Sequence, residues 1–286
     1  MSTHDDILPL GVMTGLNDDP FEDFGKVRDM GFPTCQLGGV PDHFVYGPQA
    51  EEKKEQVRQA LQETGVKVTS VFIMFTGHIW DLIDGPRTIG LVPPDTRGER
   101  AVHACAISNW ARDVGITAVF SHVGFIPESP DYFEYQPFIR TMRALCKYVK
   151  ENGQTFAFET GQETPATLRR VIEDIGLDNV GVNLDPANLI LYGKAVPLDA
   201  VDVIGEFVLN THCKDGDWPA PGGGLGHEMP LGEGKVNIRE VIKKLYHKGF
   251  RGPLTIEREI SGPQQIADIQ KAKALLEEVK AELLGS

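Results

Sequence analysis

The sequence predicts a single parallel (β/α)₈ barrel over residues 1–286. Eight short β-like segments alternate strictly with eight longer segments of helical periodicity, and this alternation is typical of parallel strands joined by crossover helices. Most of the helical segments end in a glycine. The length of 286 residues also suits the fold, because one such barrel takes about 250 residues.

The segments follow one another without a gap in the alternation. The predicted strands cover 7–12, 34–37, 66–74, 117–123, 155–159, 180–185, 207–212 and 254–257. The predicted helices cover 21–30, 51–63, 100–114, 132–150, 165–175, 198–204, 238–247 and 264–284. Trp110 lies in the middle of a predicted helix, and we expect it in the core.

Residues typical of helix ends support these boundaries. Thr164 before Pro165, and Asp131, are predicted to begin helices. A glycine suited to the C-terminal cap follows six of the helices: Gly31, Gly65, Gly115, Gly153, Gly176 and Gly249. An open doubly wound sheet is the alternative, but residues 13–17 after the first strand contain no G-x-G-x-x-G fingerprint. Closure into a barrel is therefore favoured.

Composition and charge exclude several classes of protein. The net charge of −13, without a dense run of Lys or Arg, disfavours nucleic-acid binding. No stretch approaches the roughly 20 apolar residues of a membrane span, and the polar N-terminus has no secretory pattern. The four scattered cysteines are expected to be reduced. We expect a cytoplasmic protein with a small-molecule substrate; assembly into a homo-oligomer stays open.

Two connections are longer than the others and follow the third and seventh strands, at 76–97 and 216–236. Both belong to the C-terminal face, where barrel enzymes build their active sites. Trp80 and Trp218 in these loops are candidates for an apolar wall against a sugar ring, and His227 could close over a substrate. A plain surface loop is the alternative for His227.

Four consecutive strands end in a side chain that can bind a metal. Side chains alternate across a strand, so the apolar neighbours of these residues should face the helices while Glu159, Asp185, His212 and Glu257 face the barrel interior. One acidic residue at a strand end is often only a cap, but three crowded carboxylates need a neutralising cation or protons. We expect one divalent ion, with Mn²⁺ ahead of Mg²⁺, Co²⁺ or Zn²⁺.

The strand ends also resemble a known family. The motifs are Phe-Glu-Thr at 158–160, Asn-Leu-Asp-Pro-Ala-Asn at 183–188, Thr-His-Cys-Lys-Asp at 211–215, Pro-Leu-Gly-Glu-Gly at 230–234 and Ile-Glu at 256–257. They resemble the xylose-isomerase-like barrel superfamily, and within it the sugar phosphate isomerase/epimerase group, which includes ketose 3-epimerases, hydroxypyruvate isomerases and inosose dehydratases. The resemblance implies that the four strand-end residues bind the metal and that Glu159 and Glu257 form the acid/base pair.

The resemblance extends to substrate-binding positions. His122 matches a fourth-strand position that lies near substrate in relatives; by itself it could equally be a core or capping histidine. Asn188 stands where ketose epimerases tend to have a histidine, and this difference weakens a specific ketose-epimerase assignment. Lys214 shares the strand parity of His212 and could hold a substrate oxygen, with a solvated lysine as the alternative.

These observations predict a metal-dependent isomerase or epimerase of a small sugar, acting by proton abstraction next to a carbonyl through an enediolate. A dehydratase shares the first step and is the first alternative. A non-catalytic, metal-dependent sugar-binding barrel is the second. The apurinic endonuclease branch shares the fold, but the acidic charge argues against it.

Overall fold

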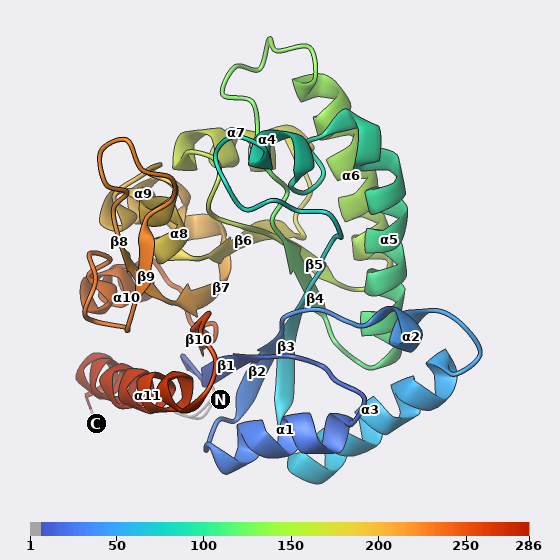
Figure 1. Ribbon diagram of the computed structural model, residues 1–286, viewed down its shortest axis with the longest axis vertical. Helices are drawn as coiled ribbons and strands as arrows, with labels where there is room; N and C mark the ends of the chain where they lie inside the picture. Colours follow the sequence, from blue (N-terminus) through green and yellow to red (C-terminus); the bar gives the residue numbers. More distant parts are fainter. Residues whose placement is uncertain (1–6, 286) are drawn as a thin grey trace.

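The protein forms a closed barrel of eight parallel strands surrounded by helices, described over residues 7–285 by a computed structural model (Figure 1). The predicted fold is confirmed. The strands follow one another around the barrel in the order β1-β10-β7-β6-β5-β4-β3-β2. Their bounds are β1 (Leu10–Thr14), β2 (Thr34–Leu37), β3 (Lys67–Phe72), β4 (Ala118–Ser121), β5 (Thr155–Glu159), β6 (Val180–Leu184), β7 (Val208–Cys213) and β10 (Leu254–Ile256).

The barrel closes because β1 pairs with both the second and the last strand. Gly11 lies opposite Thr34 on one side and opposite Thr255 on the other. A Cβ atom at position 11 would lie 2.5 Å from the Thr34 hydroxyl oxygen, so this close approach requires glycine.

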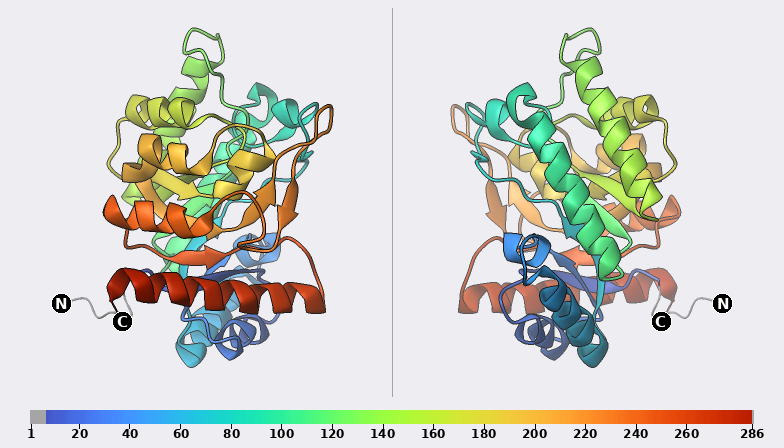
Figure 2. Two further views of the ribbon diagram at one scale, coloured as in Figure 1. Left: turned by 90° about the vertical axis from the view of Figure 1, so that its left-hand side faces the viewer. Right: turned by 90° about the vertical axis from the view of Figure 1, so that its right-hand side faces the viewer.

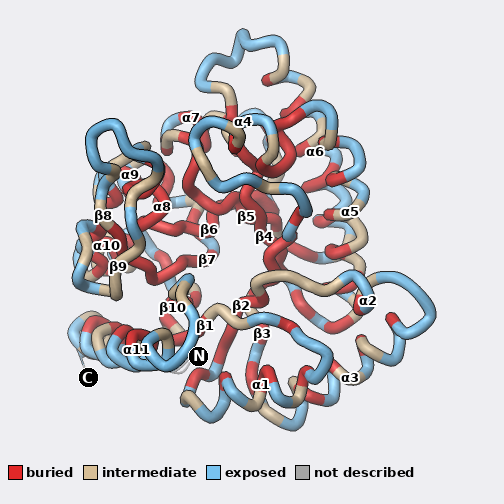
Figure 3. The backbone as a smooth tube through the Cα atoms, in the orientation of Figure 1, coloured by how far each residue is buried: buried red, intermediate tan, exposed pale blue. Residues whose placement is uncertain are grey.

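Helices cover the outside of the barrel, and Figure 3 shows their outward faces exposed around a buried centre. The long ones are α1 (Pro20–Asp29), α3 (Ala50–Thr64), α5 (Pro94–Asp113), α6 (Tyr135–Glu151), α7 (Pro165–Ile175), α9 (Pro197–Ile204), α10 (Ile238–His247) and α11 (Pro263–Leu284). The six predicted cap glycines all have positive φ, and Trp110 is buried, both as predicted. Among the described residues, no helix is long and apolar enough to span a membrane.

Several boundaries differ from those predicted. Helix α5 begins at Pro94 rather than at 100, because Pro93 and Pro94 suit a helix start. Asp131 does not begin a helix; α6 starts at Tyr135 with Glu134 before it. Thr164 does cap α7, accepting a hydrogen bond from the Thr167 N–H. The sequence analysis also missed three short helices: α2 (Asp42–Val45), α4 (Gly85–Thr88) and α8 (Pro186–Leu191).

The side chains separate into an inner and an outer set. Phe156 and Phe158 of β5 join the large apolar core between strands and helices, as their parity predicts. Ala157 faces inward and packs with Phe72 and Phe120 inside the barrel. The cysteines are unpaired, as expected.

Both long connections lie at one end of the barrel, as the left view of Figure 2 shows. The first contains α4. The second contains an antiparallel hairpin of β8 (Asp215–Asp217) and β9 (His227–Met229). This is the end at which the parallel strands terminate, so loop residues from both connections can reach the strand-end side chains.

The first connection is held firmly on the end of β4. The Leu91 and Val92 N–H groups donate to the Val123 carbonyl at 2.7 and 2.9 Å. A Cβ at Gly90 would lie 2.1 Å from the Val123 carbonyl carbon, so glycine is needed there. The Arg100 guanidinium also donates to carbonyls of the loop. These contacts fix the loop that carries Trp80.

Candidate metal centre

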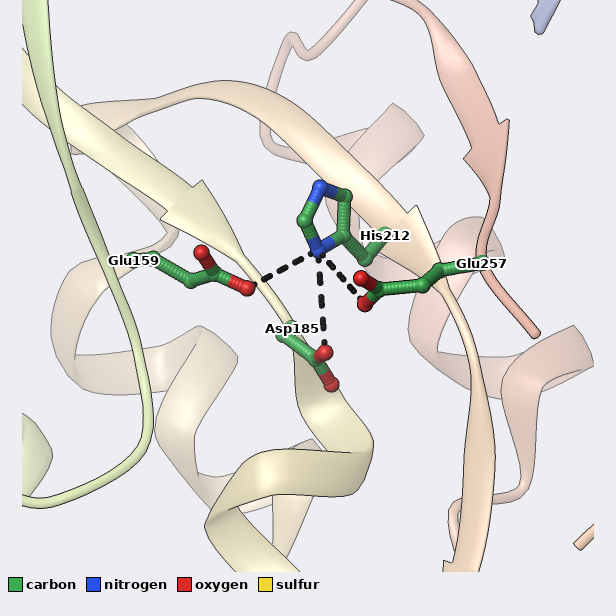
Figure 4. A group of neighbouring side chains, drawn as sticks. All are labelled: Glu159, Asp185, His212 and Glu257. Atoms are coloured by element: carbon green, nitrogen blue, oxygen red, sulfur yellow. Dashed lines mark ion pairs between the residues drawn. The ribbon is translucent and has the colours of Figure 1, made fainter. Parts of the chain in front are cut away.

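Four side chains converge where β5, β6, β7 and β10 end (Figure 4). These strands are neighbours in the barrel, and each contributes one residue: Glu159, Asp185, His212 and Glu257. One potential ligand atom from each residue lies within 4.8 Å of all the others. The four residues predicted from the sequence are therefore brought together.

One nitrogen of His212 faces all three carboxylates. Its Nδ1 lies 3.0 Å from Glu159 Oε1, 3.1 Å from Glu257 Oε2 and 3.6 Å from Asp185 Oδ2. Yet Nδ1 and Asp185 Oδ2 are both buried without a hydrogen-bond partner. Buried polar atoms are rarely left unsatisfied. Three oxygen donors and one imidazole nitrogen around a common centre suit a divalent cation, so the residues present fit a metal ion.

Neighbouring charges in the centre shift the pKa values of His212 and Glu257. Burial disfavours a charged His212, but the carboxylates of Glu257 and Glu159 outweigh it and raise the pKa of His212 well above 6.5. The pKa of Glu257 is held well below 4.5, because Lys214 and His212 outweigh burial. Without a cation, the protonated imidazole supplies positive charge to the carboxylates. A metal ion bound at Nδ1 would displace that proton.

Lys214, just past the end of β7, adds a positive charge beside the centre. Its ammonium is buried and lies 3.2 Å from Glu257 Oε2, 3.6 Å from Asp185 Oδ2 and 3.0 Å from Glu259 Oε1. Burial disfavours its charge, but these carboxylates raise the pKa of Lys214 well above 10.5. One ammonium cannot offset all of these carboxylates and Glu159, so the centre keeps a net negative charge that a divalent ion would reduce.

Asp185 uses its two oxygens differently. Helix α8 begins immediately after it, and Asp185 Oδ1 accepts a hydrogen bond from the Asn188 N–H at 2.9 Å. This is an N-cap, which satisfies a free donor of the first helical turn. Oδ2 is left to face the centre. Helix α8 in turn carries Leu191 to the wall of the pocket above the centre.

A cavity of about 450 Å³ opens above the four residues. Its polar side contains the ligand candidates except Asp185, together with His122, Asn188 and Glu259. Its apolar side is made mainly by Met13, Phe72, Met74, Trp80, Phe120, Leu191, Tyr192 and Leu225. A larger cavity of about 600 Å³ lies between 86–95 and 125–134, but none of the four residues lines it.

The other predicted site residues fall into two groups. His122, Asn188 and Trp80 line the pocket; His122 Nε2 lies 3.4 Å from Glu159 Oε2, and the Trp80 and His122 rings meet edge to face at 5.3 Å. Trp218 and His227 do not line the pocket, because the β8–β9 hairpin presents them as exposed side chains.

The sequence analysis missed three residues at the site. Tyr192 and Glu259 line the pocket, and Gln36 of β2 lies beneath it, with Oε1 2.8 Å from His212 Nε2. Glu259 follows Glu257 by two residues, and this spacing could have pointed to it. Nothing in the sequence around Gln36 indicates its partner, 176 positions away in the chain.

Comparison with known proteins agrees with this architecture. The family described as "Xylose isomerase-like TIM barrel" matches residues 24–279. A xylose isomerase domain protein from Planctomyces limnophilus is 34% identical, with a TM-score of 0.91, over 98% of this chain and 100% of that chain.

More distant structures share the fold. A xylose isomerase-like TIM barrel protein from Mycobacterium smegmatis, solved in complex with magnesium, is 18% identical with a TM-score of 0.71, over 99% of this chain and 100% of that one. A D-tagatose 3-epimerase-like protein is 17% identical with a TM-score of 0.73, over 97% of this chain and 98% of that one.

An uncharacterised protein of Methanocaldococcus jannaschii is 25% identical over 172 residues, which span 56% of this chain and only 55% of that relative. The family match extends over most of the described barrel, and the 34% identical structure covers nearly all of this chain. The chain belongs to the family of xylose isomerase-like TIM barrels.

Proposed function

We propose that this protein is a divalent-metal-dependent isomerase or epimerase of an uncharged sugar or sugar derivative that carries a carbonyl group. The observation that carries the proposal is the buried centre of Glu159, Asp185, His212 and Glu257, in which Asp185 Oδ2 and His212 Nδ1 lack hydrogen-bond partners. Similarity to structures described as sugar epimerases supports the same class. Mn²⁺ is the ion we favour.

The bound ion would supply Lewis-acid polarisation of the substrate carbonyl. Glu159 and Glu257 would then move the proton on the carbon beside that carbonyl. They end β5 and β10, which are separated by β6 and β7, so they approach the pocket from different sides. Epimerisation needs one glutamate to remove the proton and the other to return one from the opposite face. Isomerisation needs only one of them.

Each glutamate has a different polar neighbour. Glu159 Oε2 lies 3.4 Å from His122 Nε2, whereas Glu257 Oε2 lies 3.2 Å from the Lys214 ammonium. The ammonium favours the ionised carboxylate and suits Glu257 to the role of base. The His122 ring nitrogen can hydrogen-bond the Glu159 carboxyl and hold it beside the substrate, which suits Glu159 to the role of acid.

The pocket lining supports an uncharged substrate. Among the described residues that line the pocket there is neither arginine nor lysine. Two of the lining residues, Glu257 and Glu259, are acidic. Lys214 lies near but is already engaged by three carboxylates. A phosphate group would need a charged or strongly donating partner. The apolar side of the pocket suits the face of a sugar ring.

Dehydration is the second candidate, because it begins with the same proton abstraction beside the carbonyl. Loss of a β-hydroxyl group from the resulting enediolate would complete it. The protein would then release water from a polyol-derived ketone.

One experiment separates these outcomes. Protein purified without chelator is analysed for metal and then incubated in D₂O with a ketose, an inosose and hydroxypyruvate, with His212→Ala as the matched control. We expect about one divalent ion per chain and solvent deuterium in an epimerised or isomerised product. Loss of water indicates the dehydratase. Metal-loaded protein that binds a sugar without any exchange would overturn the proposal of an enzyme.

A further inference from the structure

Gln36 joins two distant strands across the interior of the barrel. It lies in β2, is fully buried, and its Oε1 is 2.8 Å from Nε2 of His212 in β7. Its Nε2 donates to Asn183 Oδ1 in β6 at 3.3 Å. Since β2 lies across the barrel from β6 and β7, these three side chains form a polar layer beneath the candidate metal centre.

The direction of these hydrogen bonds determines the state of the histidine ring. A carbonyl oxygen only accepts, so His212 Nε2 must carry the hydrogen that Gln36 Oε1 receives. In a neutral imidazole the other nitrogen, Nδ1, then holds a lone pair. That lone pair points at the position enclosed by the oxygens of Glu159, Asp185 and Glu257.

We propose that Gln36 is a positioning residue that fixes the tautomer and the ring orientation of His212, so that Nδ1 is presented to the divalent ion. The proposal rests on the proposed metal-dependent function. A partner on the second ring nitrogen is a general requirement of histidine ligands, and its removal typically lowers metal affinity about 10–100-fold.

The amide is suited to this place because it is neutral. The centre already holds three carboxylates, and Lys214 offsets only one of their charges. A carboxylate at position 36 would accept the same hydrogen bond but would leave a further negative charge buried beneath the ion. Asn183 holds the amide in its orientation, because its Oδ1 accepts from the Gln36 amide group. The layer therefore orients the ligand without changing the charge of the centre.

The test compares three variants by metal affinity, measured calorimetrically with Mg²⁺ and with Zn²⁺. Gln36→Met keeps the volume and removes the acceptor, and we expect the Kd to rise about 10–100-fold. Gln36→Glu restores the acceptor for His212 Nε2 but adds a buried negative charge and loses the donor to Asn183, so we expect it to recover part of the affinity that Gln36→Met loses. The control is Gln154→Leu, which removes another buried glutamine, one bound to Ser108 and the Ile116 carbonyl away from the centre. It should leave the Kd within about threefold of the wild-type value.

A spectroscopic readout distinguishes positioning from general destabilisation. In the Mg²⁺-loaded wild type, ¹⁵N spectra should show His212 neutral with hydrogen on Nε2, whereas Gln36→Met should show a mixture of tautomers. Folding of each variant is checked by circular dichroism, and Gln36→Glu keeps the test available if the methionine variant does not fold. Wild-type affinity in a folded Gln36→Met, or loss of affinity in Gln36→Glu equal to that in Gln36→Met, would overturn the inference. If the wild type binds no metal, the proposed function itself fails before the variants are compared.

Discussion

Glu163 gives a stability prediction whose size follows from its burial. It lies in the loop between β5 and α7 and is 2% exposed. Neither of its carboxylate oxygens has a hydrogen-bonding side chain among the described residues. Burial raises the pKa of Glu163 from 4.5 to about 8, although nearby backbone N–H groups and Lys194 favour the ionised form. At pH 7 the folded protein therefore holds this carboxyl protonated.

The sign and size of the effect follow from that pKa. Below pH 4.5 the carboxyl is protonated in both the folded and the unfolded state, so it does not lower the free energy of unfolding. As the pH rises from 4.5 toward 8, the unfolded state is increasingly favoured and the free energy of unfolding falls. Between 4.5 and 7 the unfolded chain ionises and the folded one does not, which costs about 1.4 kcal/mol per pH unit. Glu163→Gln removes this cost. Over the 2.5 pH units from 4.5 to 7 this cost adds up to about 3.4 kcal/mol, so we expect Glu163→Gln to stabilise the fold by about 3 kcal/mol at pH 7 and by about zero at pH 4.

The assay is thermal and urea unfolding of both proteins at pH 4, 5.5, 7 and 8.5, with chelator present throughout. A difference of this size corresponds to a Tm increase of roughly 5–10 °C at pH 7. Glu173→Gln on α7 is the matched control, because its exposed carboxylate pairs with Arg169 and is worth less than about 1 kcal/mol. An advantage of Glu163→Gln that is equal at pH 4 and pH 7, or absent at pH 7, would refute the reasoning.

Three further predictions concern the centre. Asp185→Ala should lose most of the bound metal, because the remaining carboxylates repel one another, and elemental analysis that finds full occupancy would contradict the ligand assignment. Chelator should lower the Tm and Mn²⁺ should restore it, since a ligand at 100 times its Kd adds about 2.7 kcal/mol; an unchanged melting curve would speak against a native-state metal. Glu159→Gln and Glu257→Gln should each retain much of the metal and lower kcat by about 10²–10⁴. Near wild-type turnover in both would leave the two-glutamate mechanism without support.

The barrel and the four strand-end residues could be predicted because both depend on local regularities. Strand parity alone places Glu159 on the inner face, since Phe156 and Phe158 need the apolar space beneath the helices. Glycines such as Gly176 mark helix ends because they adopt a positive φ that other residues avoid. Such signals lie within a few residues of the feature they predict.

The remaining contacts depend on tertiary geometry. Gln36 meets His212 only because the barrel closes, and no property of either segment specifies the pairing. The same limit explains Trp218 and His227. Their loop is long enough to reach the pocket, but the β8–β9 hairpin turns both side chains toward solvent. The Asp215 carboxylate helps to shape that loop, because it accepts hydrogen bonds from the N–H groups of Gly216, Gly232 and Val236.

The shared use of Asp185 links two equilibria. One oxygen holds the first turn of α8 and the other faces the candidate metal centre, so metal binding there and local helix stability would influence each other reciprocally. The free energy for opening that turn should rise when the centre is loaded, and the amide hydrogen of Asn188 should exchange with solvent more slowly. Since α8 carries Leu191 into the pocket wall, an empty centre would have a more mobile wall as well as uncompensated negative charge. Metal binding at this centre would thus also order the wall against which a substrate packs.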